Sequence, residues 1–476
     1  MKIARLPRHP ILAATPRKIS LLLMRSKSSV AVAEDAFHLH RTPIATAPKT
    51  AALERTRGPS PPPSPTKPVT PPSPIFVAAT NQHVGKTTVS LALMSGLKKR
   101  FHNPGFIKPV GQQSRRVTPR ISVDKDVAVM RDHFHLDHLP WESMSPVLIP
   151  KGYTRNYIDG FVSQAYHKDS IQRAYNDIEK RSDVVLVEGT GHCAVGSVVG
   201  ASNALVARWL NASIVLVANG GLGSTIDPLE YNKVLCDHYN VPIAGVIINR
   251  INPDPERFES CCDYIRRALE QNWGPEIPLL GCIPDNPSLM HFNLTDVQRS
   301  LKGSYFLTSF CPQEWHYATD QIDLVETGVS DFIAGLHTEK RDTLHLCDVD
   351  REDIIISFVL DYQNRKKHGL ETDASCLIIC GTGYYDINPH IQEFLDMMKE
   401  DPAGFPPILI TPSEAFETME LIHKFTPKHT AKDQRRVNAA VNHYEPYINF
   451  DLLLERTGNK QDASSTTTGA PTRMVV

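Results

Sequence analysis

The chain has 476 residues, which exceeds a typical single domain and favours two folded units with additional segments. Its formal net charge of −1 gives no reason to expect nucleic acid or an anionic membrane as a partner, because either would favour a basic excess. No apolar run approaches the roughly 18–20 residues that a membrane span requires. The nine cysteines include no CxxC pair, so the spacing of a metal knuckle is absent, and we interpret them as thiols in a reducing compartment.

The two ends of the chain and one early stretch differ in composition from the rest. Residues 1–33 are rich in lysine and arginine and contain no acidic residue, a composition typical of an organelle transit peptide. We expect residues 1–57 to be a transit peptide and leader, with the mitochondrion favoured and a plastid or the cytoplasm as alternatives; a basic tail or a misassigned start codon also accounts for the pattern. Residues 58–74, "GPSPPPSPTKPVTPPSP", are interpreted as a proline-rich linker, and residues 457–476 as a disordered tail.

Between residues 75 and 300, short apolar runs alternate with segments of helical pattern. Alternation of this kind predicts a parallel sheet covered by helices on both faces, with ligands at the carboxyl ends of the strands. The expected strands are 75–79, 106–110, 184–187, 214–218 and 244–248, and the expected helices include 87–99 and 169–180.

The first expected strand is followed by "TNQHVGKTT", which contains the Gly-Lys-Thr of a phosphate-binding loop. Gly85 allows the backbone to approach an anion, Lys86 adds a charge on the β and γ phosphates, and the Thr87 hydroxyl is suited to Mg²⁺. A strand-loop-helix context also directs amide groups and the positive helix end at the phosphate. The fold class is therefore α/β, a P-loop NTPase parallel sheet. The predicted nucleotide-binding residues of the loop are Val84, Gly85, Lys86, Thr87 and Thr88.

Two further charged residues follow expected strands. Glu188 ends "DVVLVE", and a carboxylate facing a phosphate loop is an ordinary Mg²⁺ anchor, the alternative being a solvent-facing residue that starts a turn. Lys108 ends "GFIK" and is expected to point towards the same site, unless it is an exposed surface lysine.

Together these motifs resemble the dethiobiotin synthetase family of P-loop proteins. Thr80 stands where the general motif has its first glycine, and that family has threonine there; "KPV" at Lys108 and "VEG" at Glu188 also match. Asp126, in "DVAVM", is the counterpart of an aspartate in a family helix, and Asn249 matches an asparagine that contacts adenine.

The resemblance implies roles for these residues, ATP and Mg²⁺ as cofactors, and a homodimer. Thr80, Lys86 and Lys108 would stabilise the transferring phosphoryl group, and Thr87, Asp126 and Glu188 would hold Mg²⁺. Asn249 would complete the nucleotide site.

A closer likeness is to the amino-terminal region of long-form phosphate acetyltransferases, in "LNASIVLVANGG" and "IPLLGCIPDNPSL". In those enzymes a DRTGG domain follows, and "GTG" at Gly381 occupies the place of its T-G-G. We therefore expect a P-loop domain at 75–300, a connecting segment at 301–345 and a smaller α/β DRTGG-like domain at 346–456. The acetyl-transferring domain has no counterpart here, so we expect no phosphate acetyltransferase activity from this chain alone.

The expected function is that of a Mg-ATP-binding protein with weak or ligand-coupled ATPase activity and a regulatory or metabolic-sensing role. Its expected partners are a nucleotide and an unknown metabolite, without nucleic acid or a membrane span. One alternative is an ATP-dependent ligase or cyclo-ligase of dethiobiotin synthetase type, although Gln112 and Gln113 replace small residues of that family and argue against its diamine substrate. A second alternative is a noncatalytic interaction protein.

Overall fold

The computed structural model describes residues 72–459, except 308–314, 339–341, 371–374, 382, 384–386, 402–403 and 431–432. The expected leader, the linker up to residue 71, the tail from residue 460 and Thr382 of the "GTG" stretch all lie outside the described residues.

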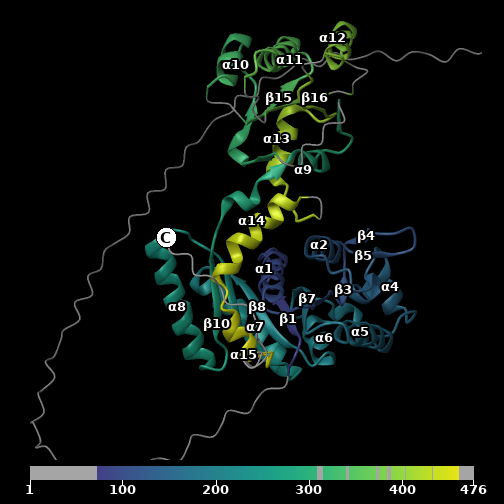
Figure 1. Ribbon diagram of the computed structural model, residues 1–476, viewed down its shortest axis with the longest axis vertical. Coiled ribbons are helices and arrows are strands. Elements are labelled where there is room, and N and C mark those ends of the chain that lie inside the picture. The colour runs from purple at the N-terminus through teal and green to yellow at the C-terminus, as the bar shows by residue number, and fades with distance from the viewer. Residues whose placement is uncertain are drawn as a thin grey trace, which may run out of the picture. The chain divides into compact units, whose positions relative to one another are not determined.

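The larger sheet has six parallel strands in the order β10-β9-β8-β1-β7-β2. Its central strand β1 is buried at every residue, as expected for a strand with sheet neighbours on both sides and helices on both faces. The predicted α/β fold with a parallel sheet is thereby confirmed (Figure 1). The strands are β1 (Ile75–Ala79), β2 (Pro104–Ile107), β7 (Val184–His192), β8 (Ser213–Asn219), β9 (Ile243–Ile251) and β10 (Leu279–Pro284).

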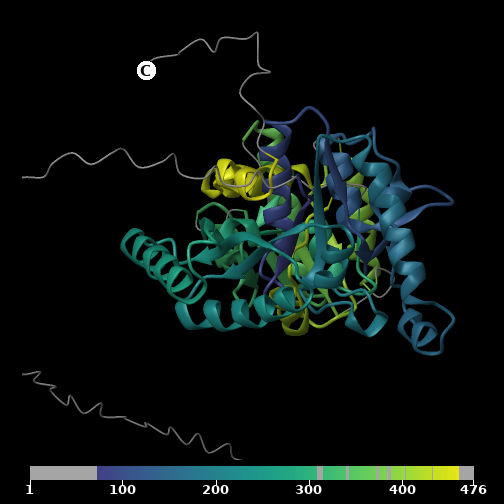
Figure 2. The ribbon, with the colours of Figure 1, turned by 90° about the horizontal axis from the view of Figure 1, so that it is seen from below.

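Helices lie on both sides of this sheet (Figure 2). The chain passes from β1 through α1 towards one edge and from β8 through α7 towards the other, so right-handed crossovers place α1 and α7 on opposite faces. The main helices are α1 (Lys86–Lys98), α2 (Lys125–Phe134), α5 (Gln164–Glu179), α6 (Asn203–Trp209), α7 (Leu222–His238) and α8 (Pro255–Trp273). Shorter elements are β3 (Val110–Gly111), β4 (Ser114–Arg116), β5 (Ser122–Asp124), α3 (Trp141–Met144), β6 (Val147–Leu148) and α4 (Tyr153–Ile158).

A second sheet, with the order β12-β17-β16-β15-β14, is parallel except at its β12 edge. It has core clusters of its own, one on each side. Its elements are β12 (Tyr305–Phe306), β14 (Ile322–Leu324), α10 (Val329–Leu336), β15 (Leu344–Asp348), α11 (Glu352–Lys367), β16 (Cys376–Cys380), α12 (Pro389–Lys399), β17 (Ile408–Ile410) and α13 (Ala415–Lys424). Beside them lie α9 (Leu294–Ser300) and the small pair β11 (Phe292–Asn293) and β13 (His316–Tyr317).

The last two helices, α14 (Gln434–Tyr444) and α15 (Phe450–Arg456), pack into the core of the six-stranded sheet. Gly96 of α1 faces the ring of Phe450 so closely that an added Cβ would lie 2.0 Å from the ring atom Cζ. Asn459 Nδ2 donates to the carbonyl of Ser73, just before β1, at 2.8 Å. These helices fall within the range 346–456 expected for the second domain, yet their buried side chains belong to the first core. We call the six-stranded sheet with α1–α8, α14 and α15 the first unit, and the five-stranded sheet with its helices the second unit.

Among the described residues, no helix combines the length and the apolar character needed to cross a membrane.

Candidate nucleotide site

The loop between β1 and α1 is fixed by its own geometry and by a buried asparagine. Gly85 adopts a φ of +85°, which favours glycine, and an added Cβ would lie 2.3 Å from Nδ2 of Asn249. Asn249 is fully buried at the end of β9 and donates from Nδ2 to the carbonyl of Val84 at 2.8 Å. In this structure Asn249 supports the loop from beneath.

A buried charged cluster lies beyond the ends of β1 and β2 and includes Glu188, which the structure places within β7 rather than after it. Lys86 Nζ lies 2.5 Å from Glu188 Oε1, and the Thr87 hydroxyl donates to the same oxygen at 3.0 Å. Lys108 forms an ion pair with Asp126 and lies 3.6 Å from Glu188. The structure therefore brings together five of the six residues that the sequence assigned to phosphate and Mg²⁺, and Thr80 is the sixth.

Asp124 joins this cluster and was not predicted. It lies 3.0 Å from Lys108 Nζ, and its other oxygen accepts from the backbone amides of Gln112 and Gln113 at 2.9 and 3.1 Å. Asp124 also caps α2 by accepting from the amide of Asp126. The run "DKD" before the apolar "VAVM" was the available signal, since it places charged residues at a helix start.

Burial and ion pairing act against each other on the charges of the cluster. Burial lowers the pKa of Lys86 despite the opposing charge of Glu188. Burial also disfavours the charge on Lys108, but Asp126, Glu188 and Asp124 outweigh it and raise the pKa of Lys108. For Asp126, burial is outweighed by Lys108 and Lys86, which hold the pKa of Asp126 well below its usual range. Lys108 and Asp126 are therefore both charged at neutral pH.

The donor set fits Mg²⁺. Two lysines face three carboxylates, and Glu188 Oε2 is buried with no hydrogen-bond partner among the described residues. No group of three or more His, Cys, Asp or Glu side chains within the described ranges is arranged to hold a metal alone. Mg²⁺ usually needs only one or two carboxylates, with substrate phosphates and water as the other ligands, so Thr87, Asp126 and Glu188 are sufficient.

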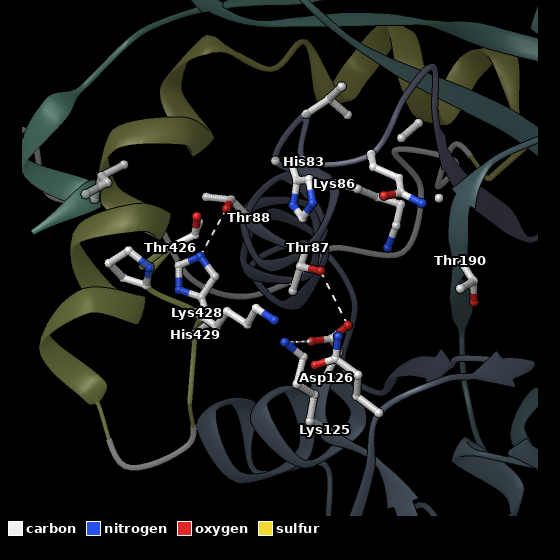
Figure 3. A pocket seen from close by; sticks show the side chains of 18 of the residues that line it. His83, Lys86, Thr87, Thr88, Lys125, Asp126, Thr190, Thr426, Lys428 and His429 are labelled. Carbon is white, nitrogen blue, oxygen red and sulfur yellow. Dashed lines mark hydrogen bonds and ion pairs between the residues drawn. The ribbon is translucent and has the colours of Figure 1, made fainter. Parts of the chain in front are cut away.

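A cavity of about 370 Å³ lies above the loop and the cluster (Figure 3). On one side it is lined by the loop from Asn81 to Thr88 and by Lys108, Asp124 and Asp126. Thr80, Glu188 and Asn249 do not line it. Thr80 is buried, and its amide donates to the carbonyl of Val217 at 2.8 Å.

The opposite wall comes from residues that sequence analysis did not connect with the site. Segment 426–429 and two residues of α14, Arg436 and Tyr444, line the same cavity as the loop. His429 Nε2 lies 3.0 Å from the hydroxyl of Thr88 (Figure 3). The two residues are 341 positions apart, and nothing in "TPKHT" signals a nucleotide site.

The sheet, the loop and the charge set define a P-loop NTPase-type domain. Residues 73–292 match a family model described as an AAA domain, AAA_26. This range begins just before β1 and ends shortly after β10, the last strand of the six-stranded sheet.

Proteins of two families match parts of this chain. A phosphate acetyltransferase of Synechocystis sp. is 22% identical over 392 residues, which cover 80% of this chain and 51% of that protein. An ATP-dependent dethiobiotin synthetase BioD of Clostridium kluyveri is 25% identical over 185 residues, or 38% of this chain and 75% of that protein. The chain spans about half the length of the phosphate acetyltransferases it matches. The predicted similarity to both families is therefore confirmed for the P-loop domain, while the DRTGG likeness stays a prediction.

Among solved structures, the MinC:MinD cell division protein complex of Aquifex aeolicus covers 46% of this chain and 83% of that chain at 16% identity, with a TM-score of 0.28. So low a score does not define a relationship between the two proteins.

Proposed function

We propose that this protein binds Mg-ATP in the cavity above the loop and turns it over slowly or in response to a second ligand, in a regulatory or metabolic-sensing role. The observation that carries the proposal is the buried cluster in which Lys86, Thr87 and Lys108 meet Asp126 and Glu188. Burying several charges costs free energy, and a fold that needs only stability gains little from it. A phosphate and Mg²⁺ site gives those charges a use.

Each residue would act on the phosphates through its position. The amide groups at the start of α1 and the Lys86 ammonium would bind the β and γ phosphates, and Lys108 would lie beside the terminal phosphate. On binding, Lys86 would exchange Glu188 for phosphate oxygens. Asn249 would hold the loop in its binding conformation through the Val84 carbonyl. Mg²⁺, held by Thr87, Asp126 and Glu188, would neutralise charge on the phosphate oxygens.

Substitution of Lys86 tests this proposal. We expect Lys86→Ala to abolish Mg-ATP binding in calorimetry, because the variant loses the one cation that lies in the loop itself. The matched control is Lys99→Ala, which removes an exposed lysine one residue beyond the same helix, paired with Glu445 at 2.6 Å. The control should bind Mg-ATP like the unchanged protein, and equal binding by Lys86→Ala would exclude the site.

An ATP-dependent ligase is the second candidate, and the lining of the cavity favours it. Beyond Lys108 the wall continues to Gln112, Gln113 and Thr190, which provides polar groups for a second substrate next to the phosphate site. The two glutamines argue for a polar acceptor different from the diamine of dethiobiotin synthetases. A thermal-shift screen of metabolites with Mg-ATP present identifies such an acceptor, and ATP turnover that is indifferent to every compound stabilising the protein would exclude the ligase.

A further inference from the structure

The segment between α13 and α14 places one more cation at the phosphate end of the cavity. Lys428 lines the cavity together with Thr87, Lys125 and Asp126. In Figure 3 its side chain extends towards these three residues. Thr87 and Asp126 would hold the proposed Mg²⁺, which would neutralise charge on the phosphate oxygens. Lys428 would therefore lie on the side of the cavity that receives the terminal phosphate of ATP.

The Lys428 ammonium makes no hydrogen bond or ion pair with any residue in the described part of the chain, whereas Lys86 and Lys108 both have carboxylate partners. Lys125 lines the same cavity as Lys428, and its Nζ lies 4.0 Å from Asp126 Oδ1. Lys125 and Lys428 thus place two positive charges close to each other, and Lys428 has no counterion among the described residues. A bound anion would stabilise this arrangement.

A buried arginine holds this segment in place. Arg436 is 4% exposed, and its Nη1 donates to the carbonyl of Lys428 at 3.2 Å. Its Nη2 donates to Asp296 at 2.8 Å, and Asp433 lies 3.3 Å from Nη1. Arg436 Nε is buried without a partner among the described residues, although Arg436 itself lines the cavity. A buried, unpaired donor in the cavity wall is a second, independent indication of an anionic ligand.

The segment also continues directly from the second unit. Ala415 and Ile422 of α13 lie in the core of the five-stranded sheet, and Lys428 follows four residues after the end of α13. His429 then contacts Thr88 in the first turn of α1. A shift of α13 would therefore move the Lys428 ammonium relative to the phosphate loop.

We propose that Lys428 contacts the terminal phosphate of bound ATP, and that this contact couples the nucleotide state of the first unit to the position of α13 in the second unit. This inference rests on the proposed function, because it requires a nucleotide in the cavity. A cation supplied by a separate element recognises the charge of the third phosphate and so distinguishes ATP from ADP.

The test measures the affinities of the full chain for ADP and for a non-hydrolysable ATP analogue, both with Mg²⁺. Lys428→Ala should weaken binding of the analogue about tenfold or more, as expected for loss of a charge-assisted contact, and leave ADP binding unchanged. Lys428→Arg should retain most of the preference for the analogue. Lys424→Ala is the matched control, since Lys424 is exposed at the end of α13 and pairs with Glu420 on the same helix.

An unchanged ratio of the two affinities in Lys428→Ala would overturn the inference while leaving the proposed function intact, and so would an equal loss of both. Failure of the unchanged protein to bind either nucleotide would overturn the proposed function as well. Hydrogen exchange gives a second readout for a variant that is less stable. The analogue, but not ADP, should slow amide exchange in α13, and this difference should disappear in Lys428→Ala but not in Lys424→Ala.

Discussion

The two units present the same kind of sheet edge but use it differently. In the first unit, Lys108 directly after β2 and Glu188 within the neighbouring strand β7 are buried and share a charged cluster. At the corresponding edge of the second unit, Asp348 at the end of β15 and Gly381 directly after β16 are exposed. The ion pair nearby, between Arg351 and Asp353 at 3.0 Å, lies at the surface.

This difference shows what marks a ligand site on a parallel sheet. The topology alone places strand ends together, and both units meet that condition. Burying opposite charges costs free energy, whereas a surface ion pair costs little and contributes little. The buried charges beside the phosphate loop, rather than the sheet edge itself, therefore support the proposal that the first unit binds the nucleotide.

The largest expected effect is a loss of stability, and it tests whether α15, the last helix, belongs to the first unit. Phe450 of α15 is 4% exposed and contacts α1 at Gly96. Phe450→Ala should lower the free energy of unfolding of the first unit by about 3–5 kcal/mol, because it opens a cavity in the core. Chemical denaturation, monitored through hydrogen exchange of the α1 amides, measures this loss.

The control for that variant is Phe416→Ala, which removes a ring of the same size from α13 where it is 61% exposed. Its free energy of unfolding should change by no more than about 0.5 kcal/mol. Equal stabilities of the two variants would contradict the assignment of α15 to the first core.

Two glycines with similar backbone angles lie at the two sheet edges, Gly85 after β1 and Gly381 after β16. Gly85 and Gly381 have φ values of +85° and +82°, so an alanine is strained at either position. At Gly85 the new Cβ would also collide with Asn249, whereas at Gly381 the nearest atom, in Glu414, lies 3.7 Å away. Gly85→Ala should weaken Mg-ATP binding about a hundredfold, equivalent to about 3 kcal/mol, because it displaces the loop.

Gly381→Ala should carry a similar backbone strain and leave Mg-ATP binding unchanged, as calorimetry on both variants would show. If Gly381→Ala weakened Mg-ATP binding as much as Gly85→Ala, backbone strain alone would explain both results. The proposal that only the edge of the first unit binds the nucleotide would then be contradicted.

The smallest expected effect is on the pH dependence of stability, and it concerns His429, which contacts Thr88. Burial, followed by the charge of Arg436, lowers the pKa of His429 to about 4, with Asp126 and Asp433 opposing and Lys125 adding to the shift. In an unfolded chain the value is 6.5, so between pH 6.5 and about 4 the unfolded state binds more protons. The contribution of neutral His429 is thus fully present above pH 6.5 and declines as the pH falls towards 4.

Acidification from pH 7 to pH 5 should therefore destabilise the unchanged protein more than His429→Gln, by on the order of 1 kcal/mol in thermal or chemical unfolding. His390→Gln, which replaces an exposed histidine of α12, should retain the full dependence. A His429→Gln variant with the same pH dependence as the unchanged protein would contradict the assigned shift.

The phosphate loop was predictable because its signal is local. A strand, a loop with Gly85 and Lys86, and a helix occur within 25 residues of each other, and the rule that ligands collect at strand ends then selects Lys108 and Glu188. The resemblance to a family added Asp126. It also assigned Asn249 a contact with the base, and the structure places that side chain beneath the loop.

The far wall of the cavity was not predictable for a physical reason. Lys428 and His429 reach the site through tertiary packing of α13 and α14, and a contact across 341 residues leaves no periodic pattern in the sequence. The same reason explains the position of α14 and α15. Their apolar pattern indicates helices, but only the packing shows which sheet they cover.

Because α14 and α15 pack into the first core, the first unit cannot be completed until these late helices have been synthesised. After β10 ends at residue 284, about 150 further residues must emerge from the ribosome before α14, which starts at residue 434, becomes available. At roughly 5–20 residues per second this delay lasts on the order of ten to thirty seconds. During that time the nascent first unit lacks the apolar side chains that α14 and α15 contribute to its core. All strands of the second sheet, which lie between residues 305 and 410, are synthesised before α14.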